Sequence, residues 1–121
     1  MESAGLGIDE SRVLDLIRRL QRVQSRIVSS ATTLTAGDDL VLVDTSGGSV
    51  TITLPPAQQH PNKKFEVKKT SASNTLTVQR SGSDLIDGAS TKAWTTNNQV
   101  YGFVSAITTA PATWGWVVLH G

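Results

Sequence analysis

Few side chains in this 121-residue sequence can perform chemistry, and their spacing does not assemble a catalytic site. The two histidines, His60 and His120, lie in no Gly-x-Ser-x-Gly or His-Glu-x-x-His pattern. Asp84 and Asp87 are three residues apart and can form a carboxylate pair or a weak cation site. However, Gly88 follows, and a turn-forming aspartate explains Asp87 more simply. There is no cysteine. We therefore expect no enzyme activity, no cofactor and no metal site.

Five of the six aromatic residues lie between residues 94 and 116, and aromatic faces can stack on sugar rings. Trp114 and Trp116 are expected on one face of an alternating strand, where a core or intersubunit role is favoured. The better surface candidate is an aromatic residue beside polar loop residues, which suits recognition through hydrogen bonds. This candidate receptor surface, with a host glycan as its expected ligand, consists of Trp94, Asn97, Asn98 and Tyr101.

Basic residues occur in two clusters, and neither favours nucleic acid binding. The first is Lys63, Lys64, Lys68 and Lys69, for which a solvated strand edge is favoured over a contact with anionic sugars. The second consists of arginines that coincide with an apolar repeat rather than preceding it, unlike a basic DNA-reading helix. The net charge is only +1, and the longest apolar run, residues 40–43, is far shorter than the ~20 residues that span a bilayer. We expect no nucleic acid partner and no membrane insertion.

Residues 9–30 are predicted to form a coiled-coil helix, because apolar residues recur at alternating spacings of three and four. The seam consists of Val13, Leu16, Leu20, Val23 and Ile27. An isolated helix of ~20 residues is marginally stable in water, so it needs a partner. The mixture of Val, Leu and Ile favours three helices over two. The alternative is a single amphipathic helix docked on its own β domain.

Residues 1–8 are predicted to be a flexible N-terminal segment, because small residues predominate there. They are a candidate anchor that threads into a groove of a larger particle, through Ser3, Ala4, Gly5, Leu6, Gly7 and Ile8. The alternative is a disordered terminus with no binding role.

From residue 31 to residue 121 the apolar period becomes two, which predicts an antiparallel β-sandwich or barrel-like knob. Two antiparallel hairpins are expected, the first from residues 40–44 and 50–54 and the second from residues 65–69 and 75–79. Further strands are expected at 99–106 and 115–119, with a turn at Asp87-Gly88. With 5% aromatic residues, this core is small, so we expect oligomerisation to supply additional burial.

The order of short motifs along the predicted knob carries a resemblance. These motifs are the run of residues 44–57 (DTSGGSVTITLPPA), residues 62–69 (NKKFEVKK), residues 74–78 (NTLTV), residues 84–88 (DLIDG), Tyr101 and residues 114–118 (WGWVV). Together they cover nearly all of residues 38–119, and this segment resembles the small β domains of bacteriophage fibre and virion-appendage proteins. The sequence departs from that pattern at Pro61-Asn62 and at Thr108 to Thr113, which affects the expected loop shapes.

The resemblance implies a noncatalytic phage virion protein on the particle surface: a homotrimer with a parallel helical stalk, a β knob and a role in host or surface adhesion. Its other partners are then virion proteins bound through the N-terminus. One alternative is a capsid decoration or head fibre protein bound through that N-terminus. A second alternative, from another class, is a stand-alone carbohydrate-binding module.

Overall fold

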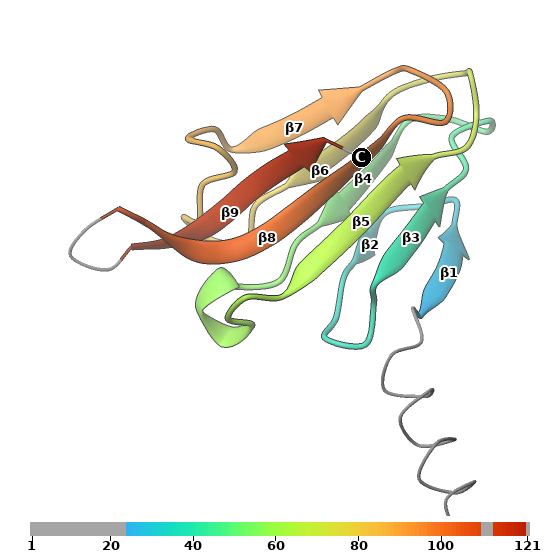
Figure 1. Ribbon diagram of the computed structural model, residues 1–121. Helices are drawn as coiled ribbons and strands as arrows, with labels where there is room; N and C mark the ends of the chain where they lie inside the picture. The colour runs from blue at the N-terminus through green and yellow to red at the C-terminus, as the bar shows by residue number, and fades with distance from the viewer. Residues whose placement is uncertain (1–23, 110–112, 121) are drawn as a thin grey trace, which may run out of the picture.

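The computed structural model describes residues 24–109 and 113–120, which form two stacked β-sheets (Figure 1). Sheet A contains, in spatial order, β1 (Ser25–Val28), β3 (Leu40–Val43), β5 (Lys64–Lys69), β8 (Val100–Thr109) and β9 (Thr113–His120). Sheet B contains β2 (Thr32–Thr33), β4 (Val50–Thr53), β6 (Leu76–Gln79) and β7 (Thr91–Trp94). A short 3-10 helix, η1 (Ala57–Gln59), lies between β4 and β5. The mainly β fold is thus confirmed.

The chain crosses between the sheets after each of the first five strands, and this makes both sheets mixed rather than antiparallel. In sheet A, β1, β3 and β5 pair in parallel, and β5-β8 and β8-β9 pair antiparallel. In sheet B, β2, β4 and β6 pair in parallel, and β6-β7 pair antiparallel. A wholly antiparallel knob was therefore the wrong prediction.

The two hairpins predicted from turn signals are also wrong. Strands β3 and β4 lie in different sheets, as do β5 and β6. The Ser46–Ser49 and Ser71–Asn74 segments turn the chain across the sandwich instead of folding it back beside itself. An alternating pattern specifies which residues share a face, but it does not specify which strand is the neighbour.

The helix predicted for residues 9–30 is wrong at its C-terminal end, because Ser25–Val28 form strand β1. This strand pairs in parallel with β3, with Ile27 in register with Leu42. The β domain therefore begins before residue 31, the start that the sequence predicted for it. The remaining predicted seam residues, Val13, Leu16, Leu20 and Val23, lie outside the described residues, as does the predicted anchor at residues 1–8.

The core lies between the sheets and is built mainly from alternate residues of the strands, together with four residues from outside the strands, Leu34, Leu54, Ala57 and Ile86. It consists of Leu34, Val41, Val43, Val50, Ile52, Leu54, Ala57, Phe65, Val67, Leu76, Val78, Ile86, Trp94, Phe103 and Trp116. The Phe65 and Trp116 rings lie 5.6 Å apart, centroid to centroid, so an aromatic pair supports the centre of sheet A. The predicted inward face of residues 50–54, with Val50 and Ile52 buried, is confirmed.

The segment between β6 and β7 joins the free side of β9. The amide of Trp116 donates to the carbonyl of Leu85 at 2.8 Å, and the amide of Asp87 donates to the carbonyl of Trp116 at 2.9 Å. Asp87 and Gly88 both have positive φ, 48° and 81°, which confirms the predicted turn there. The backbone of β9 is therefore hydrogen-bonded on both sides.

Replacing Gly115 with alanine is expected to destabilise this junction. A Cβ atom at Gly115 lies 2.9 Å from the carbonyl oxygen of Leu85 and 3.2 Å from Oγ1 of Thr108, so the backbone has to shift. We expect the free energy of unfolding, measured by urea denaturation, to fall by about 1–3 kcal/mol. Gly47→Ala is the control, because nothing lies within 4 Å of a Cβ at that position. Equal losses in both variants contradict the packing described for Gly115.

The Asp39 carboxylate links Gln24, which precedes β1, to Lys63, which precedes β5. Its Oδ2 accepts the Gln24 amide at 2.9 Å, and its Oδ1 lies 2.6 Å from Nζ of Lys63. The hydrogen bond from Lys63, and secondly the one from the Gln24 amide, hold the pKa of Asp39 below its ordinary value of 3.8. The carboxylate thus links the segment that precedes β1 to the centre of sheet A.

The lowered pKa of Asp39 predicts a loss of stability in acid. Because the pKa is lower in the folded state, the stabilisation is present above the unfolded-state value of 3.8 and is lost as pH falls through the folded-state value. We expect urea midpoints of the natural chain to fall below about pH 4 more steeply than those of Asp39→Asn. Parallel slopes for the two proteins would show that Asp39 carries no such linkage.

Candidate functional site

The outward-facing surfaces of the two sheets differ sharply in chemistry. Alternation and strand register place only small polar residues and one alanine on the outer face of sheet B: Thr33, Thr51, Thr53, Thr77, Gln79, Thr91 and Ala93. Threonine is common on the solvent face of a sheet, because it combines β propensity with a hydroxyl that water can bind. This face is suited to remain in water.

The outer face of sheet A is instead largely apolar. Its apolar residues are Ile27, Leu40, Leu42, Val100, Val104, Val117 and Leu119. Ile27 and Leu119 are 73% and 42% exposed, and the other five are half-buried. They flank the central strand β5, whose outward residues are Lys64, Glu66 and Lys68. Nζ of Lys64 lies 4.0 Å from Oε2 of Glu66, so both signs of charge occur within the face.

Partly exposed apolar patches of this kind, on both sides of a charged central strand, mark an interaction surface in soluble proteins. Sequence reasoning missed it, although the signal was present. Residues 40–43 (LVLV) and 116–119 (WVVL) are apolar at every position, and a strand without alternation is expected to be covered on both sides. The core covers one side of these strands. The outer face of sheet A is therefore a candidate self-association site.

The part of the chain that carries the predicted coiled coil joins sheet A directly. Gln24 precedes β1, which is an edge strand of sheet A. The Gln24 carbonyl accepts hydrogen bonds from the amides of Asp39 and Leu40. Ile27, the one predicted seam residue that the structure describes, lies on the apolar outer face rather than on a helix.

The prediction that Trp94 forms a receptor surface is wrong, because this side chain is only 7% exposed and belongs to the core. Its Nε1 donates to the carbonyl of Gln99 at 3.2 Å, and its ring packs edge-on against Tyr101 with centroids 4.7 Å apart. The polar residues that follow Trp94 indicated a loop. They did not show that the last residue of β7 faces inward.

The other predicted receptor residues do not form one surface with Trp94. Asn97 and Asn98 are exposed in the β7-β8 loop, where Asn98 has φ of 64° and its amide donates to the carbonyl of Lys69 at 2.8 Å. Tyr101 is half-buried, and Nζ of Lys92 lies 4.6 Å from its ring centroid. The exposed amides lie on the loop, whereas the two aromatic rings pack against each other.

The lysine cluster is not a solvated strand edge, because β5 is the central strand of sheet A. Lys69 is fully buried, and its Nζ donates to the carbonyls of Ser71 and Ser73. It therefore holds the crossover from β5 to β6 in place. Lys63 pairs with Asp39, so this side chain also has a structural partner.

The two aspartates considered as a carboxylate pair serve separate backbone groups. Oδ2 of Asp84 accepts the Ala57 amide at 2.8 Å, and Oδ1 of Asp87 accepts the Val118 amide at 3.1 Å. Within residues 24–109 and 113–120, no three His, Asp or Glu side chains converge into a metal-binding group. The helical element in the described part of the chain is three residues long, and no described helix is a bilayer-spanning segment.

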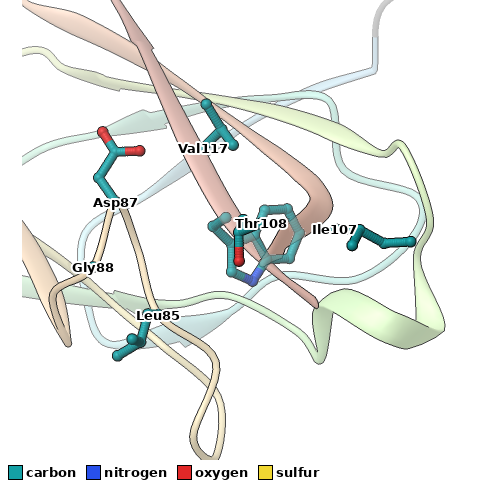
Figure 2. Close-up of a pocket in the computed structure, with 7 residues that line it drawn as sticks. Leu85, Asp87, Gly88, Ile107, Thr108 and Val117 are labelled. Carbon is teal, nitrogen blue, oxygen red and sulfur yellow. The ribbon is translucent and has the colours of Figure 1, made fainter. Parts of the chain in front are cut away.

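One pocket lies between the β6-β7 segment and the end of the β8-β9 pair (Figure 2). Its volume is about 530 Å³, and it is lined by Leu85, Asp87, Gly88, Ile107, Thr108, Trp116 and Val117. Sequence reasoning weighed Asp87 as part of a carboxylate pair or a weak cation site and favoured a turn with Gly88. It gave Trp116 a core or intersubunit position and predicted no pocket here. Comparison with known proteins adds no assignment, because no protein-family model and no curated protein matches the chain.

Proposed function

We propose that this chain is a noncatalytic structural protein of a bacteriophage virion, a homotrimeric fibre or appendage that projects from the particle and supports adhesion. The observation that carries the proposal is the apolar outer face of sheet A, on which Ile27 is 73% exposed. The outer face of sheet B is, by contrast, rich in threonine. The alternating spacing of three and four from Val13 to Val23, before the first strand, supports three copies. The resemblance of residues 38–119 to phage appendage domains supports the virion.

Three-fold association accounts for the outer face of sheet A in physical terms. Each buried square ångström of apolar surface stabilises an assembly by roughly 25 cal/mol. Covering this face therefore adds stability to a chain whose own core contains few aromatic residues. The charged β5 row divides the face into two apolar flanks, one on β1 and β3 and one on β8 and β9. Unlike flanks on one subunit suit a head-to-tail ring, in which one flank contacts the other flank of the next copy.

The stalk is tested by a charge at the predicted seam. We expect Leu20→Asp to lower the mass measured by light scattering from three chains toward one, because it places an unpaired charge where three helices meet. Gln21→Asp, at the neighbouring outward heptad position, is the matched control and keeps the trimer. An unchanged mass for Leu20→Asp would remove the coiled coil from the proposal.

The virion assignment is tested by labelling intact phage particles that encode this chain with a gold-conjugated antibody. Label on particle surfaces supports an appendage, and label confined to unassembled protein contradicts it. Label on the head, together with loss of binding to empty capsids after removal of residues 1–8, selects a capsid decoration or head fibre protein. Label on the tail selects a tail fibre.

A further inference from the structure

The pocket described above combines apolar walls with a small number of polar groups. Leu85 and Ile107 are 44% and 54% exposed and form its apolar rim, whereas Asp87 and Thr108 contribute a carboxylate and a hydroxyl (Figure 2). Its volume of about 530 Å³ falls within the range of ordinary small-molecule sites. The pocket therefore has the size and mixed character of a ligand site.

The pocket is held in place by backbone hydrogen bonds on each side. The pairing of Leu85 and Asp87 with Trp116 fixes one wall, and Oγ1 of Thr108 donates to the carbonyl of Thr113 at 3.2 Å on the other. The Asp87 carboxylate is oriented by the Val118 amide, which occupies Oδ1. A site held in this way loses little conformational entropy when it binds a ligand.

A second observation at the same place points to a ligand. Trp116 lines the pocket, and its Nε1 is buried without a hydrogen-bond acceptor among the described residues. An unpaired buried donor of this kind costs about 1–3 kcal/mol. The pocket thus presents a carboxylate and a hydroxyl as acceptors, and an unused donor lies buried in its wall.

We propose that this pocket binds a saccharide unit. A sugar hydroxyl can donate to Asp87 and accept from a donor such as Nε1 of Trp116, and the apolar face of a sugar ring suits the Leu85 and Ile107 rim. Because Nε1 does not meet solvent, the ligand reaches it when the exposed rim side chains move aside. The inference deepens the adhesive part of the proposed function and rests on that part, but it does not depend on the number of chains.

The test uses the full chain with ¹⁵N-labelled tryptophan, whose three indole N–H signals can be followed by NMR. Trp94→Phe and Trp114→Phe assign the signal of Trp116 by elimination. The probes are the methyl glycosides of glucose, galactose, rhamnose and N-acetylglucosamine. We expect at least one of them to shift the Trp116 signal saturably while the Trp94 signal stays unmoved.

Two variants connect such a shift to the pocket. Asp87→Asn retains an acceptor for the Val118 amide and tolerates positive φ, and we expect it to weaken binding about tenfold through loss of the charged acceptor. Thr108→Val provides a second variant with the same expectation. Asp44→Asn is the control, because Asp44 is also a turn aspartate whose Oδ1 accepts a backbone amide, that of Ser46, at 2.9 Å. It should bind as the natural chain does.

The saccharide proposal is overturned if none of the four glycosides moves the Trp116 signal, or if Asp87→Asn and Asp44→Asn bind equally well. It is also overturned if the Trp94 signal moves instead, which locates binding near the β7-β8 loop. Light scattering on the same samples separates the two proposals. A trimer without a shift overturns the pocket alone, and a monomer with a saturable shift overturns the trimer and identifies a stand-alone carbohydrate-binding module.

Discussion

Replacing Val104 with aspartate is expected to convert the proposed homotrimer into folded monomers. Val104 lies in the middle of the outer face of sheet A, in register with Lys64 on one side and Val117 on the other. Lys64 can pair with the new carboxylate, so a single chain stays folded. At a covered interface the same charge costs about 3 kcal/mol per contact, or roughly a hundredfold in dissociation constant. Light scattering and circular dichroism measure the mass and the fold.

The matched control is Thr77→Asp, which places the same charge on the outer face of sheet B. Thr77 is a half-buried outward residue of β6, in register with Thr51 and Ala93. We expect this variant to keep the mass of three chains. If both variants remain trimeric, or if both dissociate, the outer face of sheet A is not the interface.

Replacing Val50 with aspartate is expected to unfold the chain. Val50 is 3% exposed and belongs to the core, so a carboxylate there is removed from water without a partner. We expect a loss of about 5 kcal/mol or more in the free energy of unfolding, which equals the whole stability of a domain at the lower end of the usual range. The β signal in circular dichroism and the urea unfolding transition should both be lost.

The neighbouring residue supplies the control for Val50→Asp. Thr51 is half-buried on the opposite, outward face of β4, so Thr51→Asp is expected to change stability by no more than about 1 kcal/mol. If both substitutions unfold the chain, or if both are tolerated, the face of β4 has been assigned wrongly.

Alternation in the sequence predicted strand faces well because it reports local burial. Val50 and Ile52 point inward, and Phe65 and Val67 do the same, as the period of two indicates. The partner of each strand could not be predicted in this way. Turn residues at Ser46–Ser49 are compatible with a tight hairpin and with a crossover to the other sheet. The crossovers, which make β3 and β5 parallel neighbours, depend on packing over the whole domain.

The predicted boundary between the helix and the β domain, at residues 30 and 31, was wrong for a related reason. Ile27 continues a spacing of three and four from Val23, but residues 25–28 are too few to fix a period. A short apolar pattern fits both periods, and tertiary contacts decide between them. Here the pairing with β3, together with the ion pair between Arg26 and Asp38 at 3.0 Å, selects a strand.

One of the two candidate sites could have been predicted from the sequence. Strands that are apolar at every position, such as residues 40–43, indicate that the outer face of sheet A is also covered. The pocket was not recoverable, because Leu85 and Trp116 are 31 positions apart and meet only through the parallel bridge beside β9. Trp94 was misplaced because the orientation of its strand end depends on pairing with Leu76.

Sedimentation equilibrium of the unaltered chain at low micromolar concentration tests the central claim most directly, since it reports mass independently of shape. We expect a single species of three times the 12.9 kDa chain mass. A well-folded species with the mass of one chain would contradict it, because the outer face of sheet A would then stay exposed to water.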